Sequence, residues 1–478
     1  MGKNIGGTVG APFEGIKEFV SCSLSKPGES LPNDDLDLQL VWLDILRGKG
    51  PFITSLDLAR GWQENITYPF DEYGVAISNL NAGLKPPATG FYNNWFCGAM
   101  GASIRSEIWA CLFPGRPGTA GWYAYQDASV DHWNEGIYGE VFLAALESAA
   151  FCATPEPDIF SLVKRGLSFI PENSKVFRVV KLAVSSFLEG KTLGETREKI
   201  LAGFGHHNFT DCVQNIGFII AGLLYGKGDF WQTIVTAVRC GYDADCTGAA
   251  AGAIAGIISG GKKLVKGGYH AGSRIVPGPG IKGISVPRTI EEMAGEIAAI
   301  RTRIENEENL PVISPGFLIP PLPEFERPFS LPFSISEPFI PGSLGIKNGY
   351  DAWKSKIRHT KKIFDSFFFD LSPYFLETPS AVLMETNLIL GENKKLKLFP
   401  ASTDGIKMWI DGKLKLSHHL HSDFLPAPHR PGSPLAEVEL GKGKHRILLE
   451  VRRCAVNFEF AWIVAEENNH IAAGIQYR

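Results

Sequence analysis

The stretch GYDADCTGAAAGAIAGIISG, residues 241–260, decides the fold of the first half of this chain. From Thr247 to Ser259 it consists mostly of Ala and Gly and contains no Pro, which predicts a helix. Small side chains let neighbouring helices approach closely, so we expect this helix at the centre of a helical domain. Asp243 and Asp245 stand where the helix begins.

Other helical patterns flank this central segment. Residues 35–46 (DLDLQLVWLDIL) place Leu36, Leu40 and Leu43 at helical spacing, and residues 290–306 are amphipathic and are predicted to form a closing helix. Further helices are predicted over residues 139–152, 192–201, 213–224 and 229–240. No stretch before residue 310 shows sustained two-residue alternation, so we expect an all-α domain over residues 1–310.

A proline-rich segment follows the helical patterns. Residues 311–341 contain nine prolines and five phenylalanines. Proline fixes φ and lacks an N–H donor, so neither a long helix nor a central strand is expected here. A flexible linker would be polar, and this segment is not. We therefore predict an extended strap over residues 311–345, packed on the surface of one or both domains.

After the strap the hydrophobic period changes to two. Strands are predicted over residues 381–390, 395–399, 405–410, 436–440, 445–452 and 457–464. Asp411-Gly412 between two of these hydrophobic runs is a strong signal for a hairpin turn. Six short strands predict a β-sandwich, jelly-roll-like, as an accessory domain over residues 346–478.

Composition excludes several classes of protein. The 478 residues are 44% hydrophobic and 21% charged, the proportions of an ordinary soluble globular protein. Because 47 basic and 51 acidic residues give a net charge of −4, nucleic acid is not an expected partner. No run reaches about 18 uncharged apolar residues, so no membrane partner is expected.

The N-terminus and the cysteines bear on cellular location. The first residues run into a Gly-rich sequence with no apolar stretch typical of a signal peptide. We expect a cytoplasmic protein, or an exported one whose leader has been removed. The eight cysteines are scattered without a CxxC pair, which favours buried thiols in a reducing compartment. The oligomeric state stays open.

Two acidic clusters carry the chemical signal. The first is PNDDLD, residues 32–37, and the second is GYDADCTG, residues 241–248. Each can be read as a helix cap with first-turn carboxylates. Acids two residues apart before a small, deeply packed helix would repel one another unless a cation lies between them. Oxygen ligands from both clusters would favour Mg²⁺, Mn²⁺ or Ca²⁺ over zinc.

Three motifs in order resemble the ADP-ribosylglycohydrolase family. They are GGTVGAPFE at residues 6–14, NDDL at residues 33–36, and GYDADCTGAAAG at residues 241–252. The resemblance covers roughly residues 5–300. The chain departs from the family pattern at Gly7, where the family has Asp, and at Asn33 and Cys246, where it has Thr.

The resemblance implies an all-α fold that holds Mg²⁺, as one or two ions, between the early and late acids. Mn²⁺ or Ca²⁺ are the alternatives. The metal ligands implied in this way are Asn33, Asp34, Asp35, Asp243, Asp245 and Cys246. Glu14 matches the family glutamate over the bound ribose, and Glu14, Asp35 and Asp37 are the catalytic candidates. Two metals would orient vicinal ribose hydroxyls and activate a water for attack at the anomeric carbon.

Further polar residues are candidates for substrate binding, each with an alternative in the core. They are Gly98, Arg105, Asp131, His132 and Tyr138. Arg105 would contact a phosphate or a substrate carboxylate, or would form a buried ion pair. His132 would orient a ligand or relay a proton, or would be a satisfied core histidine. Tyr138 would supply an aromatic wall, with core packing as the default.

The predicted activity is hydrolysis of an N- or O-glycosidic bond at a ribosyl or ADP-ribosyl anomeric carbon. The expected partner is a small-molecule substrate or an ADP-ribosylated or glycosylated one. The alternatives are another furanoside, nucleoside or sugar glycoside, or a non-catalytic binding protein similar to lens crystallins. The C-terminal domain resembles galactose-binding-like or PA14-like sandwiches, which implies either carbohydrate binding or a structural role.

Overall fold

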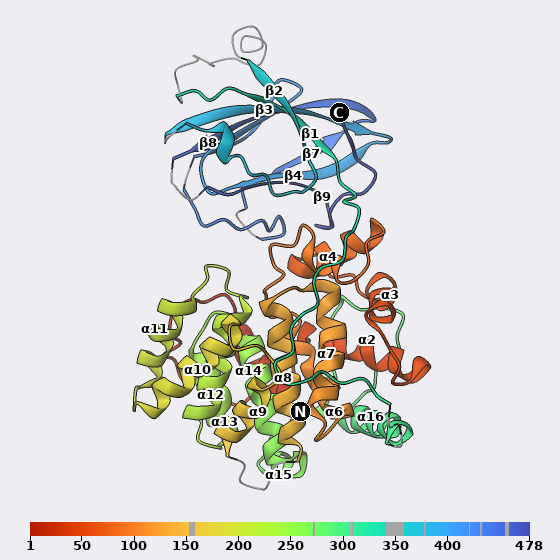
Figure 1. Ribbon diagram of the computed structural model, residues 1–478, viewed down its shortest axis with the longest axis vertical. Helices are drawn as coiled ribbons and strands as arrows, with labels where there is room; N and C mark the ends of the chain where they lie inside the picture. Colours follow the sequence, from red (N-terminus) through yellow and green to blue (C-terminus); the bar gives the residue numbers. More distant parts are fainter. Residues whose placement is uncertain are drawn as a thin grey trace. The chain divides into compact units, whose positions relative to one another are not determined.

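The computed structural model describes residues 1–478 except 153–157, 271–272, 306, 308, 341–357, 377–378, 420, 431–432 and 455–457 (Figure 1). The chain divides into two compact units. One contains Met1–Tyr68 and Asn79–Pro323, and the other contains Pro69–Ser78 and Glu324–Arg478. The predicted boundary at 345/346 lies outside the described residues.

The first unit is helical, which confirms the predicted all-α domain. The α-helices are α1 Gly2–Gly10, α2 Asp34–Lys49, α3 Ser55–Asn65, α4 Asp71–Asn81, α5 Ala88–Phe91, α6 Ser106–Leu112, α7 Pro117–Asp131, α8 Glu135–Ala150, α9 Ile159–Leu167, α10 Lys175–Leu188, α11 Leu193–Phe204, α12 Cys212–Tyr225, α13 Phe230–Arg239, α14 Ala244–Ser259, α15 Gly261–Lys266 and α16 Ile290–Ile304. Helix α4 is shared between the two units. Short 3₁₀ turns η1 Ala11–Phe13 and η2 Ser103–Arg105 flank α1 and α6.

Helix α14 is the centre of this unit, as its composition predicts. Every residue from Ala244 to Ala255 is buried. It packs against α1, α8, α12 and α13, whereas α11 and α16 lie toward the periphery (Figure 1). A helix that is buried on all sides needs apolar or small residues around its whole circumference, and the Ala/Gly sequence supplies them.

Glycine permits the contact between α1 and α14. A β-carbon at Gly6 would lie 1.9 Å from the Gly248 carbonyl oxygen, and one at Gly10 would lie 2.1 Å from the Ala244 carbonyl oxygen. Both distances are far inside van der Waals contact. Glycines at every fourth position therefore let the two backbones touch along one helix face.

The first part of the predicted strap packs on the helical unit. Ile313 is buried and its N–H donates to the Gly118 carbonyl at 3.0 Å. Gly316 N–H donates to the Ser168 carbonyl at 2.8 Å, and the Phe317 ring meets the Tyr125 ring edge-on. These contacts fix an extended segment that has few hydrogen bonds of its own.

The second unit is built from antiparallel strands in two sheets. The strands are β1 Leu331–Ser336, β2 His359–Phe364, β3 Ser380–Leu390, β4 Lys394–Ser402, β5 Ile406–Ile410, β6 Lys413–His418, β7 Ala436–Leu440, β8 Gly443–Arg453, β9 Phe460–Glu466 and β10 Gln476–Tyr477. One sheet has the order β2-β1-β3-β8-β5-β6 with β10 beside β3, and the other has the order β7-β4-β9. The predicted β-rich region is confirmed, and each of the six predicted strands has a counterpart.

Strand β1 corrects one expectation. It lies inside the predicted strap and between two other strands, although the proline content argued against an inner strand. It pairs with β2 along its whole length but with β3 only at Ser334 and Ile335. Pro332, which has no N–H to donate, therefore falls outside the short pairing with β3.

The predicted hairpin turn is present. Asp411 and Gly412 both have positive φ, 50° and 80°, which is the signature of a type I′ turn between β5 and β6. Trp409 on β5 packs against a buried cluster of Phe339, Ala381, Leu383 and Leu448. Its ring thus contributes to the apolar packing of this sheet.

All eight cysteines are free thiols. The expectation that they are buried is confirmed for Cys212, Cys240 and Cys246, but it is wrong for Cys22, Cys152 and Cys454, which are exposed. In the described part of the chain, no helix combines the length and the apolar character that crossing a bilayer requires.

Candidate metal centre

Helix α14 begins beside the end of α1, and a short turn fixes this arrangement. The Tyr242 N–H donates to the Ile16 carbonyl at 2.6 Å, and the Gly15 N–H donates to the Tyr242 carbonyl at 2.8 Å. Gly241 has φ +72°, and a β-carbon there would lie 2.5 Å from two backbone oxygens of residues 16 and 18. The late acidic cluster is thereby held next to the residues that follow α1, Glu14 among them.

The early acidic cluster is fixed by a helix cap. Asn33 Oδ1 accepts the Asp35 N–H at 2.8 Å and so caps α2. The Asn33 amide fills the space beside Gly7, where a β-carbon would lie 2.6 Å from Asn33 Nδ2 and 3.6 Å from Asp35 Oδ2. Gly7 and Asn33 are therefore next to each other.

Asp35, Asp245 and Cys246 converge into one group. One ligand atom from each lies within 4.8 Å of the others. The Cys246 thiol donates to Asp35 Oδ1 at 3.3 Å across 211 positions of sequence. Asp35 Oδ2 and Asp245 Oδ1 are buried, and neither has a hydrogen-bond partner among the residues that the structure describes. Buried carboxylate oxygens in this state need a compensating charge, so the donor set fits a divalent cation.

Burial dominates the electrostatics of this group. It raises the pKa of Asp245 well above its usual range, and the nearby charges of Asp243 and Asp35 add to the effect. Burial likewise raises the pKa of Asp35, while the positive charge of Lys3 opposes the rise. Without a cation, the folded protein favours the protonated forms of these acids.

Lys3 is a buried cation that sequence reasoning missed. Its Nζ lies 2.9 Å from Glu107 Oε1, and Gln39 Nε2 donates to Glu107 Oε2 at 2.8 Å. Burial alone would lower the pKa of Lys3, but the charges of Glu107 and Asp35 outweigh it and the pKa is raised. The spacing of four residues places Lys3 and Gly7 on one face of a helix, but only the structure shows that this face lies beside Asp35.

The remaining predicted ligands surround the group. Asp243 is 2% exposed and precedes α14, yet its side chain makes no capping hydrogen bond. Burial raises the pKa of Asp243, and the charge of Glu14 contributes next. Glu14 is exposed and Asp34 is partly buried. Glu14 thus reaches the solvent while its charge acts on the buried acids.

Asp37 has a different environment from the one expected of a catalytic acid. It is fully buried, and its carboxylate accepts the Tyr68 hydroxyl and the Gly278 N–H, the latter at 2.9 Å. A β-carbon at Gly280 would lie 2.1 Å from the Tyr68 ring. Asp37 therefore anchors the loop around residues 278–280 to α2, and its oxygens are occupied in doing so.

Arg105 lies in a buried ion-pair network at the end of α7. Its guanidinium donates to Asp127 Oδ1 at 3.1 Å and to both oxygens of Asp131 at 2.8 and 3.0 Å. Burial alone would raise the pKa of Asp131, but Arg105 and His132 outweigh it and hold the pKa below its usual value. Arg105, Asp127 and Asp131 are all 0% exposed. Of the two roles considered for Arg105, the structure therefore contains the buried ion pair.

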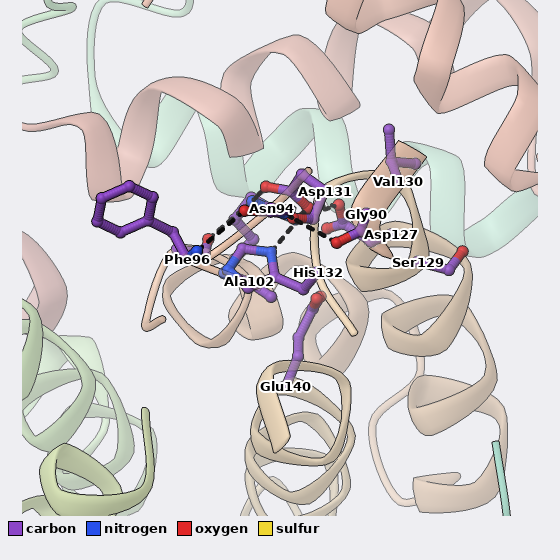
Figure 2. Close-up of polar contacts among 12 residues, drawn as sticks. Gly90, Asn94, Phe96, Ala102, Asp127, Ser129, Val130, Asp131, His132 and Glu140 are labelled. Carbon is purple, nitrogen blue, oxygen red and sulfur yellow. Dashed lines mark hydrogen bonds and ion pairs between the residues drawn. The ribbon is translucent and has the colours of Figure 1, made fainter. Parts of the chain in front are cut away.

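His132 belongs to the same network (Figure 2). Its Nε2 accepts the Ala102 N–H at 3.2 Å, and its Nδ1 lies 2.9 Å from Asp131 Oδ1. These contacts place the ring proton on Nδ1. Figure 2 shows Glu140 directed toward this group from α8; burial and the charge of Asp127 raise the pKa of Glu140 well above its usual range.

Gly98 and Tyr138 lie in more open positions. The Gly98 carbonyl accepts the Cys212 N–H at 2.8 Å, and a β-carbon at this glycine would have open space around it, as far as the described residues go. Tyr138 is partly buried, and its hydroxyl accepts the Ile319 N–H at 3.5 Å from the strap. Neither residue is among the three that form the metal group.

Comparisons with known proteins identify the family of the chain. The ADP-ribosylglycohydrolase family model matches residues 1–298. A solved structure described as an ADP-ribosylglycohydrolase-related protein complex is 18% identical with a TM-score of 0.43, over 63% of this chain and 94% of that one. No curated protein matches the chain. Because the family model covers more than half of its length, this chain belongs to the ADP-ribosylglycohydrolase family.

Proposed function

We propose that the chain is a divalent-metal-dependent glycohydrolase that cleaves an N- or O-glycosidic bond at a ribosyl or ADP-ribosyl anomeric carbon. The observation that carries the proposal is the pair of buried, unpartnered oxygens on Asp35 and Asp245. They belong to the starts of α2 and α14, where the resemblance of the sequence to the family implies metal ligands.

Asp35 and Asp245 would hold the cation, with Asp34 and Asp243 beside them. A bound divalent cation would supply Lewis-acid charge to the ribose hydroxyls and lower the pKa of a water. The buried acids of the chain would fix the cation, and Lys3 with Glu107 would keep Asp35 in place.

Glu14 is the candidate for proton transfer and for stabilising positive charge at the anomeric carbon. It is exposed to solvent, while its charge acts on both Asp243 and Asp245. An exposed carboxylate whose charge reaches the buried acids can accept a proton from water and favour an oxocarbenium-like transition state. Asp37 and the Arg105 network would support the fold around the site.

The test combines metal binding with turnover. Mg²⁺ and Mn²⁺ are titrated calorimetrically into the chelator-treated protein, with and without ADP-ribose, and N- and O-linked ADP-ribosyl conjugates are assayed for release of ADP-ribose. We expect metal-dependent turnover that Glu14→Gln reduces by about 100-fold or more, with metal affinity retained. Glu18→Gln, four residues away and also exposed, is the matched control and is expected to act as the parent does.

Other outcomes select the alternatives. Metal binding without any effect of ADP-ribose would direct the search to other furanosides, nucleosides and sugar glycosides. ADP-ribose binding without hydrolysis of any conjugate would indicate a non-catalytic binding protein. Absence of metal binding would contradict the proposal.

A further inference from the structure

Cys246 occupies a position in the metal group that is unusual for a site of oxygen ligands. We propose that the Cys246 sulfur is itself a metal ligand, and that the Asp35–Asp245–Cys246 group consequently selects a borderline cation of the Zn²⁺ or Co²⁺ type over Mg²⁺. This inference rests on the proposed function only in requiring that a cation enters this group.

The geometry suits coordination by sulfur. Cys246 Sγ and Asp35 Oδ1 are 3.3 Å apart, and all three ligand atoms of the group lie within 4.8 Å of one another. In a tetrahedral zinc site, bonds of about 2.3 Å to sulfur and about 2.0 Å to oxygen place the two ligand atoms about 3.5 Å apart. The distance in this structure is close to that value without rearrangement of either helix.

A second observation points to a ligand between these residues. Within the described part of the chain, Asp35 Oδ2 and Asp245 Oδ1 lack a hydrogen-bond partner, and the two residues are only 1% and 7% exposed. If the acids served only to cap α14, at least one oxygen would accept a first-turn N–H, but the N-cap residue Asp243 makes no such bond. One ligand atom each of Asp35, Asp245 and Cys246 is left within 4.8 Å of the others.

Cys246 differs from the other two buried cysteines. The thiols of Cys212 and Cys240 donate to backbone carbonyls, those of Glu135 and Thr236, each at 3.6 Å. This is the ordinary environment of a structural thiol. Cys246 instead donates to a carboxylate oxygen of Asp35. Burial and the charges of Asp243 and Asp245 raise the pKa of the Cys246 thiol well above its usual range. A cation that binds between the three groups must therefore displace the thiol proton to solvent.

The ligand chemistry sets the preference for the cation. Mg²⁺ requires oxygen ligands in near-octahedral geometry and gains little from sulfur. Thiolate sulfur binds cations at the zinc end of the divalent series much more strongly. Replacing one oxygen ligand by Cys246 therefore shifts the preference of the site while the two carboxylates continue to bind.

Co²⁺ is the probe, because a thiolate ligand gives it a near-ultraviolet charge-transfer band that oxygen ligands do not give. Co²⁺, Zn²⁺ and Mg²⁺ are titrated into the full chain after chelator treatment, with thiols reduced. Every protein carries Ser in place of the exposed Cys22, Cys152 and Cys454, so that their thiols contribute no band. We expect the band at one Co²⁺ per chain, and Zn²⁺ binding tighter than Mg²⁺ binding.

Cys246→Ser is the test variant and Cys240→Ser is the matched control. Both thiols are buried, Cys246 in the first turn of α14 and Cys240 directly after the end of α13. Cys246→Ser is expected to lose the band and at least about tenfold in Zn²⁺ affinity, with Mg²⁺ affinity kept or raised. Cys240→Ser is expected to keep the charge-transfer band and the Zn²⁺ affinity of the parent. If Cys246→Ser does not fold, as judged by circular dichroism, Cys246→Thr takes its place.

The outcomes separate this inference from the proposed function. Co²⁺ binding without a charge-transfer band, or a band that persists in Cys246→Ser, would overturn the role of sulfur and leave a metal-dependent hydrolase. Mg²⁺ binding tighter than Zn²⁺ binding would overturn the selectivity. Failure of every cation to bind would overturn the proposed function as well.

Discussion

The Asn33 amide occupies the space that a side chain at Gly7 would need, with Nδ2 2.6 Å from the position of a β-carbon there. The same amide caps α2 through its oxygen, which accepts the Asp35 N–H at 2.8 Å. Gly7 on α1 and Asn33 before α2 therefore act as one unit that places Asp35. A larger side chain at position 7 would therefore compete with the Asn33 amide for the same space.

The first prediction concerns this pair. Gly7→Ala gains about 1 kcal/mol of helix propensity, but the new methyl group displaces the Asn33 amide and costs about 1 kcal/mol of capping. We expect Gly7→Ala to leave the free energy of unfolding of the parent almost unchanged. In the Asn33→Thr variant the same change should raise it by about 1 kcal/mol, because the shorter Thr side chain leaves room for the methyl group and still caps the helix. A double-mutant cycle by urea unfolding measures the coupling. Additivity within about 0.3 kcal/mol would contradict it.

The contact between α1 and α14 gives the second prediction. Gly6→Ala would place a β-carbon 1.9 Å from a backbone oxygen that cannot move aside. We expect the free energy of unfolding to fall by about 3 kcal/mol or more. Gly48→Ala is the control, since Gly48 is exposed in α2 with open space around it, and it should stabilise by about 0.5–1 kcal/mol. Equal effects of the two changes would contradict the close packing.

The third prediction is the pH dependence of stability in the metal-free protein. The folded-state pKa values of Asp243 and Asp245 are raised by burial above the ordinary value of 3.8. Between the unfolded and folded pKa values the folded state binds more protons, so rising pH favours unfolding. We expect the free energy of unfolding, measured in urea with a chelator, to fall as pH rises above about 4.

A saturating divalent cation should remove this fall, because the cation binds the ionised carboxylates. Asp245→Asn should reduce the slope in the absence of metal and abolish most of the metal effect. The opposite result would be a free energy of unfolding that rises with pH in the metal-free parent. It would show that other groups of the protein already balance the negative charges of Asp243 and Asp245.

The fourth prediction separates fold from substrate binding in the Arg105 network. Asp131→Asn leaves the fully buried guanidinium with one carboxylate fewer, and we expect a loss of about 3–5 kcal/mol in unfolding free energy. Glu305→Gln breaks an exposed i,i+4 pair with Arg301 and should change stability by less than about 0.5 kcal/mol. A raised KM with unchanged stability in Asp131→Asn would instead assign Asp131 to the substrate.

The fifth prediction concerns Asp37. Tyr68→Phe removes a hydroxyl donor from a buried carboxylate and should cost about 1–3 kcal/mol of stability while metal affinity is retained. Urea unfolding and calorimetric metal titration on the same preparation measure both quantities. If Tyr68→Phe instead lost turnover while its free energy of unfolding stayed that of the parent, Asp37 would have a catalytic role.

Local patterns in the sequence determined much of the fold. The Ala/Gly composition of residues 247–259 predicted a central helix, and α14 is buried from Ala244 to Ala255. The Asp411-Gly412 dipeptide predicted a hairpin, and both residues have the positive φ that this turn requires. These features depend on propensity, periodicity and backbone sterics within a few residues. They can therefore be predicted without knowledge of the tertiary contacts that each element makes.

Only the tertiary structure decided which acids meet. Asp35 and Cys246 are 211 positions apart, and their 3.3 Å contact depends on glycines that let α1 touch α14 and make room for Asn33. Asp37 and Asp35 are neighbours on α2, yet one anchors a loop and the other joins the metal group. Burial, charge compensation and the pairing of distant backbones set these roles, and none of them is encoded in the spacing of the acids along the chain.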